Sequence, residues 1–271
     1  MAKQDKELSE WLPQVIEISH QAGDAIVEIY NREFDIEHKD DKSPLTEADM
    51  AAHHIIVDGL EAMTPDIPVL SEESASVPYA ERSQWRRYWL VDPLDGTREF
   101  IKRNGEFTVN IALIEDGQAI MGVIVVPVSG QCFYACRGQG AYSVARGGVA
   151  ERIHVRQLDP GNMRIAGSRS HAGERLKIFL VNVGDHELVS MGSSLKSCLV
   201  AQGQADIYPR LGPTSEWDTA AAQAIVEEAG GMIVTLDMKQ LRYNTKDSLL
   251  NPEFLVIGDM DHDWAQYLPQ D

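Results

Sequence analysis

The sequence predicts a mixed architecture, with an α+β first half and an α/β second half. In the first half, two helical patterns precede a β-hairpin whose apolar strands flank Asp116-Gly117, a typical tight-turn pair. After about residue 150, short strand and helix patterns alternate, as in layered α/β proteins. We therefore expect an α+β domain over residues 1–150 and an α/β domain over residues 151–271. Because no low-complexity linker separates them, we expect the two domains to pack tightly.

Composition restricts the class of protein. A hydrophobic fraction of 44% over 271 residues suits a substantial core, and the chain has no run of 18 apolar residues that would span a membrane. The polar N-terminus does not resemble a signal peptide, and 3 cysteines favour a reducing cytoplasm over a disulfide framework. The net charge of -18 argues against duplex DNA and long RNA as partners. A small anionic substrate stays compatible if metal ions and local basic groups offset this charge.

Each element of the first half is expected from its local pattern. Residues 8–30 place apolar side chains at steps of three and four and predict a helix, and a second helix is expected over residues 46–63. The alternation in residues 107–113 predicts a strand with one face toward a core. Gly138-Gln139-Gly140 lacks the third glycine and the helix of a dinucleotide-binding motif, so we interpret it as a hairpin turn. The remaining strands are expected over residues 67–70, 89–91, 120–126, 132–136 and 141–144.

The second half alternates between the two kinds of element. Its longest helical pattern opens after residues 213–218, continues through the strong helix formers of residues 220–229 and stops at Gly230-Gly231. Two further helices are expected over residues 172–181 and 195–202. Strands are expected over residues 164–167, 186–191, 205–211, 232–234 and 254–257.

The central motif is a pair of carboxylates that follows the strand at residues 89–91. Asp92 and Asp95 flank Pro93-Leu94, and Gly96 follows. If the strand continued, the two acids would point to opposite faces, but Pro93 and Gly96 predict that it ends and that a turn brings the acids together. At 4 Å and an effective dielectric constant of 20, two ionised carboxylates repel by about 4 kcal/mol, which favours a shared proton or a cation such as Mg²⁺ or Mn²⁺. A solvated surface turn is the alternative.

Two further acids stand where helices are expected to begin. Thr46 and Asp49 match a capping box, in which an acid three residues after the cap stabilises the start of the helix. Local sequence alone favours this structural role for Asp49. Asp218 would likewise be stabilised in a first helical turn by the helix dipole, by about 0.3–1 kcal/mol. For both acids, a functional role needs support from elsewhere in the chain.

Three motifs occur in order at residues 70–74 (LSEES), 89–97 (WLVDPLDGT) and 216–221 (EWDTAA). Together they resemble the lithium-sensitive, magnesium-dependent phosphatases of the inositol monophosphatase superfamily. The second half resembles the 3′(2′),5′-bisphosphate nucleotidases of that superfamily, through residues 168–171 (SRSH), 192–201 (GSSLKSCLVA) and 208–214 (YPRLGPT). The resemblance covers nearly the whole chain. It implies the layered α/β/α/β/α sugar-phosphatase fold, with the active site between the two halves.

The resemblance also implies a role for each matching residue. The family's metal ligands correspond to Glu72, Asp92, Asp95 and Asp218 and the backbone carbonyl of Leu94, which would hold two or three Mg²⁺ ions, with Mn²⁺ as a substitute. Asp49 and Thr97 would orient or deprotonate the attacking water. Gly96 and Thr97 would hold the scissile phosphate at a helix N-terminus. Implied substrate contacts are Glu72, Leu94, Asp95, Gly96, Thr97, Ser168, His171, Gly192, Lys196, Arg210 and Asp218.

The activity that the resemblance implies is Mg²⁺-dependent hydrolysis of adenosine 3′,5′-bisphosphate, and of its sulfated analogue, in sulfur assimilation and nucleotide clearance. Lys196 supports an anionic ligand independently, because a lysine at the start of a helix opposes the helix dipole. An inositol monophosphatase or sugar bisphosphatase with the same metal site is the nearest alternative. A non-catalytic nucleotide-binding protein is a further one, against which the intact set of acids argues. The expected location is cytoplasmic, with peripheral membrane association and the oligomeric state left open.

Overall fold

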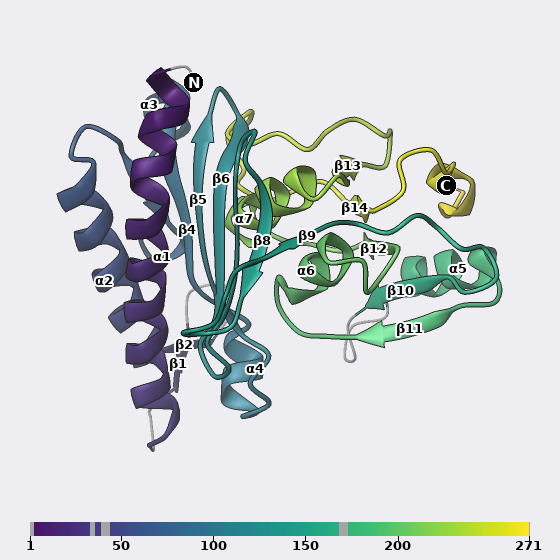
Figure 1. The fold of residues 1–271 in the computed structure, drawn as a ribbon, viewed down its shortest axis with the longest axis horizontal. Coiled ribbons are helices and arrows are strands. Elements are labelled where there is room, and N and C mark those ends of the chain that lie inside the picture. The colour runs from purple at the N-terminus through teal and green to yellow at the C-terminus, as the bar shows by residue number, and fades with distance from the viewer. Residues whose placement is uncertain (1–2, 33–35, 39–43, 168–172, 271) are drawn as a thin grey trace.

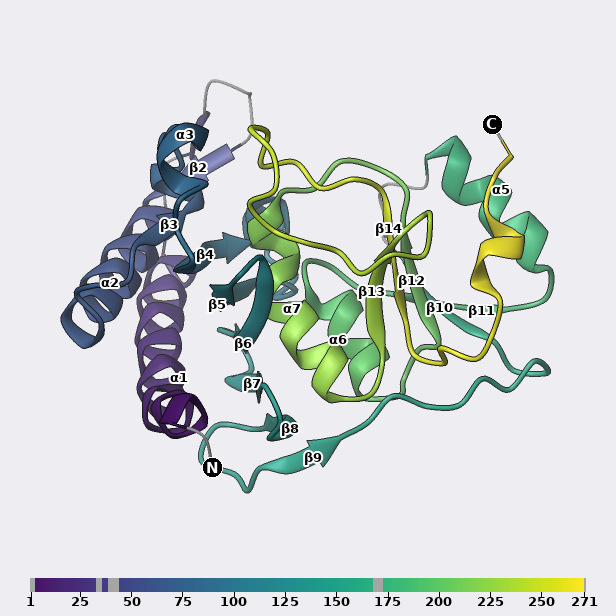
Figure 2. The ribbon, with the colours of Figure 1, turned by 90° about the horizontal axis from the view of Figure 1, so that it is seen from above.

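The structure is a computed structural model that describes residues 3–32, 36–38, 44–167 and 173–270. Its elements lie in five layers, α/β/α/β/α, which confirms the expected fold (Figure 1). Helices α1 (Lys3–Tyr30) and α2 (Glu47–Met63) cover the outer face of a seven-stranded sheet. Helices α6 (Leu195–Ala201) and α7 (Glu216–Glu228) form the middle layer. A five-stranded sheet follows, and α5 (Glu174–Val183) packs with the C-terminal 3-10 turn η2 (Trp264–Tyr267) on its far face (Figure 2).

The seven-stranded sheet has the strand order β3-β4-β5-β6-β7-β8-β9. Only β3 and β4 are parallel, and every other neighbouring pair is antiparallel. The predicted hairpin is confirmed, because Asp116 and Gly117 both have positive φ and join β5 to β6. The bounds of the strands are β3 (Val69–Ser71), β4 (Arg87–Asp95), β5 (Thr108–Glu115), β6 (Gln118–Val126), β7 (Gln131–Cys136), β8 (Gly140–Val144) and β9 (Glu151–Ile153). The division into domains near residue 150 stays a prediction.

Strand β5 corrects one expectation. The alternation in residues 107–113 predicted a single buried face, but every residue of β5 is buried. The reason is that α1 covers one face of this sheet and α7, more than 100 residues later in the chain, covers the other. A pattern that looks amphipathic therefore belongs to a strand with protein on both faces. The sequence also did not predict the short elements β1 (Ile36–His38), β2 (Pro44–Thr46), η1 (Glu72–Ser74) and α3 (Tyr79–Arg82).

The five-stranded sheet is mixed, with the strand order β11-β10-β12-β14-β13. Strand β10 runs parallel to β11 and β12, whereas β14 runs antiparallel to β12 and β13. The five strands expected in the second half are therefore confirmed. Their bounds are β10 (Arg164–Gly167), β11 (Glu187–Ser190), β12 (Ile207–Arg210), β13 (Met232–Thr235) and β14 (Phe254–Ile257). Within the described part of the chain, every helix is too short or too polar to cross a bilayer.

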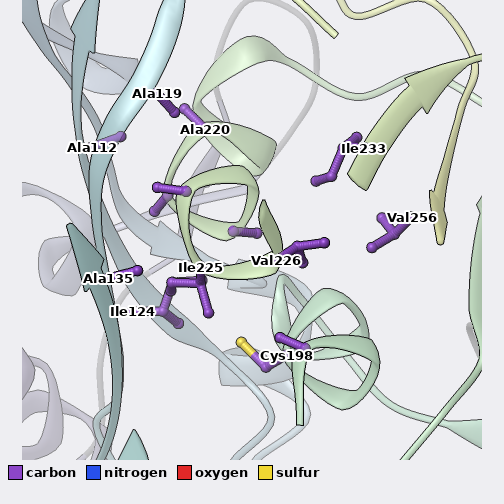
Figure 3. Close-up of a cluster of buried hydrophobic side chains, with 14 of the residues drawn as sticks. Ala112, Ala119, Ile124, Ala135, Cys198, Ala220, Ile225, Val226, Ile233 and Val256 are labelled. Atoms are coloured by element: carbon purple, nitrogen blue, oxygen red, sulfur yellow. The ribbon is translucent and has the colours of Figure 1, made fainter. Parts of the chain in front are cut away.

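The middle layer fixes the position of α7 relative to the first sheet. Figure 3 shows side chains of α7 between Ala112, Ile124 and Ala135 on one side and Ile233 and Val256 on the other. Small residues permit a close approach: a Cβ atom added at Gly122 of β6 would lie 2.2 Å from the carbonyl oxygen of Ala221. Because interiors are packed this tightly, α7 cannot shift without disturbing both sheets. The first turn of α7 is thereby held beside the end of β4.

Candidate active site

Asp92 and Asp95 lie on the same face of the sheet, but not by the turn that the sequence predicted. Strand β4 does not end at Asp92 and continues to Asp95, so that prediction was wrong. Asp92 pairs with Asn110 and Asp95 with Thr108, so β4 advances three residues where β5 advances two. The extra residue is a β-bulge, which suits Pro93 because the bulge needs no ladder hydrogen bond there. Since Thr108 and Asn110 share a face of β5, their partners Asp92 and Asp95 share it too.

Asp218 joins these two acids from the first turn of α7. Carboxylate oxygens of Asp92, Asp95 and Asp218 all lie within 4.8 Å of one another, and we call these three residues the acidic cluster. A backbone N–H orients each carboxylate. Leu94 donates to Asp92 Oδ1 at 3.1 Å, Ser194 to Asp95 Oδ2 at 2.6 Å, and Ser215 to Asp218 Oδ2 at 2.9 Å. These bonds fix the three side chains before any ligand arrives.

Burial controls the protonation of the acidic cluster. It raises the pKa of Asp218 to about 8 and that of Asp95 to about 6, and it raises the pKa of Asp92 well above its ordinary value. Repulsion from neighbouring carboxylates, including Glu72, adds to each shift. Without a cation, the cluster therefore retains protons at neutral pH. Its donors are all oxygen atoms, which fit a hard divalent cation such as Mg²⁺ or Mn²⁺.

Asp49 caps helix α2 and also accepts a hydrogen bond from Thr97. Its Oδ2 accepts hydrogen bonds from the backbone N of Thr46 at 2.8 Å and from Thr46 Oγ1 at 2.6 Å, so the predicted capping box is confirmed. Its Oδ1 accepts from Thr97 Oγ1 at 3.3 Å. Thr97 opens α4 (Thr97–Ile101) directly after Gly96, whose φ of +96° is accessible mainly to glycine. Asp49 and Thr97 therefore form one pair beside the acidic cluster.

Two hollows meet at the acidic cluster. The larger, about 380 Å³, is the acidic cleft, and it contains the remaining expected ligands Glu72 and Leu94 as well as Thr97. The smaller, about 160 Å³, is the cationic pocket, and it is lined by Lys196 and Arg210. Both hollows share Asp95, Gly96, Glu99, Thr214 and Asp218. A ligand can therefore contact the acidic cluster and the cationic pocket at the same time.

The cationic pocket offers hydrogen-bond donors that the described protein atoms do not use. Lys196 is buried, which lowers the pKa of its ammonium group to about 8, although the carboxylate of Asp95 opposes the shift. Its Nζ donates to the carbonyl oxygen of Ser193 at 2.6 Å and lies 5.3 Å from the centre of the Tyr208 ring. Within the described part of the chain, Nε of Arg210 and Oγ of Ser193 are buried without a partner. Buried donors of this kind are expected to bind a ligand or water.

Of the other residues expected to contact the substrate, Gly192 lies in the pocket, whereas Ser168 and His171 are not described. Gly192 lies in the cationic pocket, and its N–H donates to Glu106 at 2.8 Å. A Cβ atom there would lie 2.7 Å from the Glu106 carbonyl oxygen, so the position requires glycine. Ser168 and His171 lie outside the described residues.

Sequence reasoning missed Ser193 and Ser194. The hydroxyl of Ser194 hydrogen-bonds Asn110 at 2.9 Å and Thr108 at 2.8 Å, which ties the start of α6 to the bulged part of the first sheet. The sequence signal for both serines is their place in the motif at residues 192–201, between Gly192 and Lys196.

Comparisons with known proteins agree with this architecture. Residues 7–262 match the inositol monophosphatase family. The chain is 50% identical, over 90% of its length and 98% of the other chain, to the 3′(2′),5′-bisphosphate nucleotidase CysQ of Escherichia coli K12. It is 42% identical to CysQ of Aggregatibacter actinomycetemcomitans, over 93% of this chain and 94% of the other.

Solved structures of the same family superpose on this chain. The crystal structure of CysQ from Bacteroides thetaiotaomicron superposes with a TM-score of 0.80 at 42% identity, covering 91% of this chain and 96% of that one. The inositol monophosphatase of Thermotoga maritima superposes with a TM-score of 0.73 at 25% identity, covering 93% of each chain. With the family match extending over nearly all of its length, the chain belongs to the inositol monophosphatase family.

Proposed function

We propose that this chain is a Mg²⁺-dependent 3′(2′),5′-bisphosphate nucleotidase that hydrolyses adenosine 3′,5′-bisphosphate to AMP and phosphate. One observation carries the proposal: a pocket with cationic and hydroxyl donors adjoins an acidic cluster, and the two share Asp95 and Asp218. A substrate with two anionic groups fits this arrangement better than a monophosphate. The names of the CysQ relatives, at 50% and 42% identity, support the same activity. The sulfated analogue carries a second anionic group too, so the proposal includes it.

The acidic cluster supports the metal requirement. The family is metal-dependent, and the acidic cluster has the donor atoms for a cation. We assign Asp92, Asp95, Asp218 and Glu72, with the carbonyl of Leu94, to Mg²⁺ because all offer oxygen atoms to one cleft. When bound, such a cation shields the charge of the phosphate and stabilises the leaving alkoxide. The protein contributes by holding the carboxylates in place through the N–H groups of Leu94, Ser194 and Ser215.

Asp49 and Thr97 are assigned to the attacking water. Oδ2 of Asp49 is occupied by Thr46, so Oδ1 is the oxygen that takes the Thr97 hydroxyl proton into a hydrogen bond. That bond leaves the lone pairs of Thr97 Oγ1 free to accept from a water molecule in the cleft. The water is then oriented with its own lone pair toward the phosphate. Positioning of this kind carries much of phosphoryl transfer, in which little covalent chemistry falls to the protein.

The cationic pocket is assigned to the second anionic group of the substrate. Lys196 and Arg210 supply positive charge, and Ser193 supplies a hydroxyl donor. Because Asp95, Glu99 and Asp218 line the same pocket, acceptance of a small polyanion by this protein of net charge -18 also requires the proposed cation to offset these carboxylates. Gly192 lines this pocket and permits the close approach of Glu106 and Glu99. Ser168 and His171 complete the proposed nucleotide contacts.

Phosphate release from purified protein with Mg²⁺ tests the proposal. Adenosine 3′,5′-bisphosphate, inositol 1-phosphate and fructose 1,6-bisphosphate are compared, each with and without Li⁺. We expect a strong preference for the nucleotide and inhibition by Li⁺. A preference for inositol 1-phosphate would retain the metal site and overturn the assignment of the cationic pocket. Absence of release from all three would favour a different phosphoester or a non-catalytic nucleotide-binding role.

The proposal places the enzyme in the cytoplasm. Cys132, Cys136 and Cys198 are buried, and none of them forms a disulfide. Burial raises the pKa of the Cys132 thiol to about 12, so it is unreactive, and such thiols suit a reducing compartment.

A further inference from the structure

We propose that Arg82 is a positioning residue that holds the carboxylate of Asp218 in the acidic cluster, through the segment at residues 244–251. Arg82 ends the short helix α3 and lies in the chain between the expected ligands Glu72 and Asp92. Asp218 belongs to the other half of the chain. The inference rests on the proposed metal site, but it does not depend on which phosphoester is the substrate.

Arg82 is a buried guanidinium with acceptors from one distant segment. Its side chain is 1% exposed. It donates to the side chain of Asn244, to the carbonyl oxygen of Lys246 at 3.1 Å and to the carbonyl oxygen of Asp247. Asn244 Nδ2 donates back to the Arg82 carbonyl oxygen at 2.6 Å. Because the planar guanidinium presents its donors in a fixed fork, these bonds fix both the position and the orientation of the segment.

The same segment holds the residues that begin α7. The backbone N of Glu216 donates to the Leu249 carbonyl oxygen at 2.8 Å. The backbone N of Asn251 donates to Thr214 O at 2.8 Å, and its side chain donates to Ser215 O at 2.7 Å. The segment at residues 244–251 therefore holds three consecutive residues in place by hydrogen bonds: Thr214, Ser215 and Glu216. Ser215 in turn donates its N–H to Asp218 Oδ2 at 2.9 Å.

A second link runs through Glu216. Its carboxylate is buried and accepts from the backbone N of Asn244 at 2.9 Å. Asn244 has a φ of +55°, a left-handed conformation that its neighbours must hold in place. Asn244 thus connects Arg82 of the first half to Glu216, two residues before Asp218. Losing the guanidinium leaves the Asn244 side chain and the carbonyl groups of Lys246 and Asp247 without this donor, so the segment is no longer held in one position.

Mn²⁺ binding to metal-free protein tests this role without any substrate. Binding is measured by electron paramagnetic resonance for wild type, Arg82→Met and Asn244→Gly. Glycine at 244 retains the left-handed backbone and removes only the side chain that bonds Arg82. We expect the dissociation constant to rise about tenfold in both variants, the usual effect of removing a group that orients a metal ligand. Arg86→Met is the matched control, because Arg86 is exposed and pairs only at the surface with Asp116, and its constant should stay within about twofold of wild type.

A double-mutant cycle separates positioning from general distortion. If Arg82 acts through Asp218, Arg82→Met should add little to the loss of Mn²⁺ affinity already caused by Asp218→Asn. Full additivity, or wild-type Mn²⁺ binding by folded Arg82→Met, would overturn the proposal. If Arg82→Met does not fold, the test rests on Asn244→Gly alone. A dissociation constant for Mn²⁺ equal to that of wild type would then overturn the positioning role of Arg82. Absence of Mn²⁺ binding to wild type would refute the metal site and this inference with it, whereas phosphate release tests the nucleotide assignment separately.

Discussion

Replacing Asp218 by asparagine should stabilise the metal-free protein while it weakens the response to metal. Asparagine has nearly the same shape, and its carbonyl oxygen can still accept the Ser215 N–H that now binds Oδ2. The difference is charge. Burial and the neighbouring Asp95 make an ionised carboxylate costly at this position unless a cation is present.

The size of the effect follows from the pKa of Asp218. A rise from 3.8 to about 8 corresponds at pH 7 to about 4 kcal/mol of unfolding free energy, at about 1.4 kcal/mol for each pH unit. The side chain borders the open acidic cleft, where solvent screens its charge. We therefore expect the substitution to raise the unfolding free energy by roughly half of this amount, about 2 kcal/mol. For a chain of this length, that corresponds to a rise in melting temperature of roughly 4–8 °C.

The direction of the Asp218 pKa shift determines the pH at which Asp218→Asn stabilises the protein. The folded-state pKa of Asp218 lies above the unfolded value, so its contribution to wild-type stability is complete below about pH 4 and is lost as the pH rises toward about 8. The advantage of Asp218→Asn should therefore be absent near pH 4 and largest at pH 8. Thermal melts in EDTA at both values measure it, with the exposed Asp66→Asn as the control. Added Mg²⁺ should stabilise wild type more than the variant, and a variant no more stable than wild type at pH 8 in EDTA would refute the reasoning.

Three further variants test other parts of the site and fold. Asp95→Asn should lower phosphate release at least about 100-fold with an unchanged circular dichroism spectrum, and a fully active variant would contradict the metal assignment. Lys196→Met should raise KM for adenosine 3′,5′-bisphosphate roughly 10–100-fold and leave KM for inositol 1-phosphate nearly unchanged; equal changes would contradict the role of the cationic pocket. Gly122→Ala should lower the free energy of unfolding in urea by at least about 2 kcal/mol, because its Cβ would lie 2.2 Å from Ala221 O. Gly23→Ala should cost little, because the nearest atoms to its Cβ would lie at 3.6 Å.

Local chemistry predicted most of the fold. The hairpin at Asp116-Gly117 and the cap at Thr46 were predictable because each depends on a few adjacent residues. The burial of both faces of β5 was not, because the second face is covered by α7 from the other end of the chain. Short elements such as α3 also escaped prediction, since four residues carry too little periodicity to be recognised.

The acidic pair shows the limit of local reasoning about the site. Pro93 and Gly96 indicated that Asp92 and Asp95 would converge, and they do, but through a bulge in a continuing strand. A bulge is defined by the register against β5, which no reading of β4 alone can supply. The N–H that orients Asp95 comes from Ser194, about 100 residues later in the chain. The identity of the acids was therefore predictable, whereas their geometry depended on long-range pairing.

The two capping acids show that a capping role does not use both oxygens of a carboxylate. The capping boxes at Thr46 and Ser215 each use Oδ2 of the acid three residues later. A carboxylate has two oxygens, so the cap fixes the side chain and leaves Oδ1 for other contacts. In Asp49 that oxygen already accepts from Thr97. In Asp218 an oxygen lies within 4.8 Å of both other acids of the cluster. A helix cap is then a means of orienting a functional carboxylate at low entropic cost, and a capping motif beside other acids is no evidence against a metal ligand.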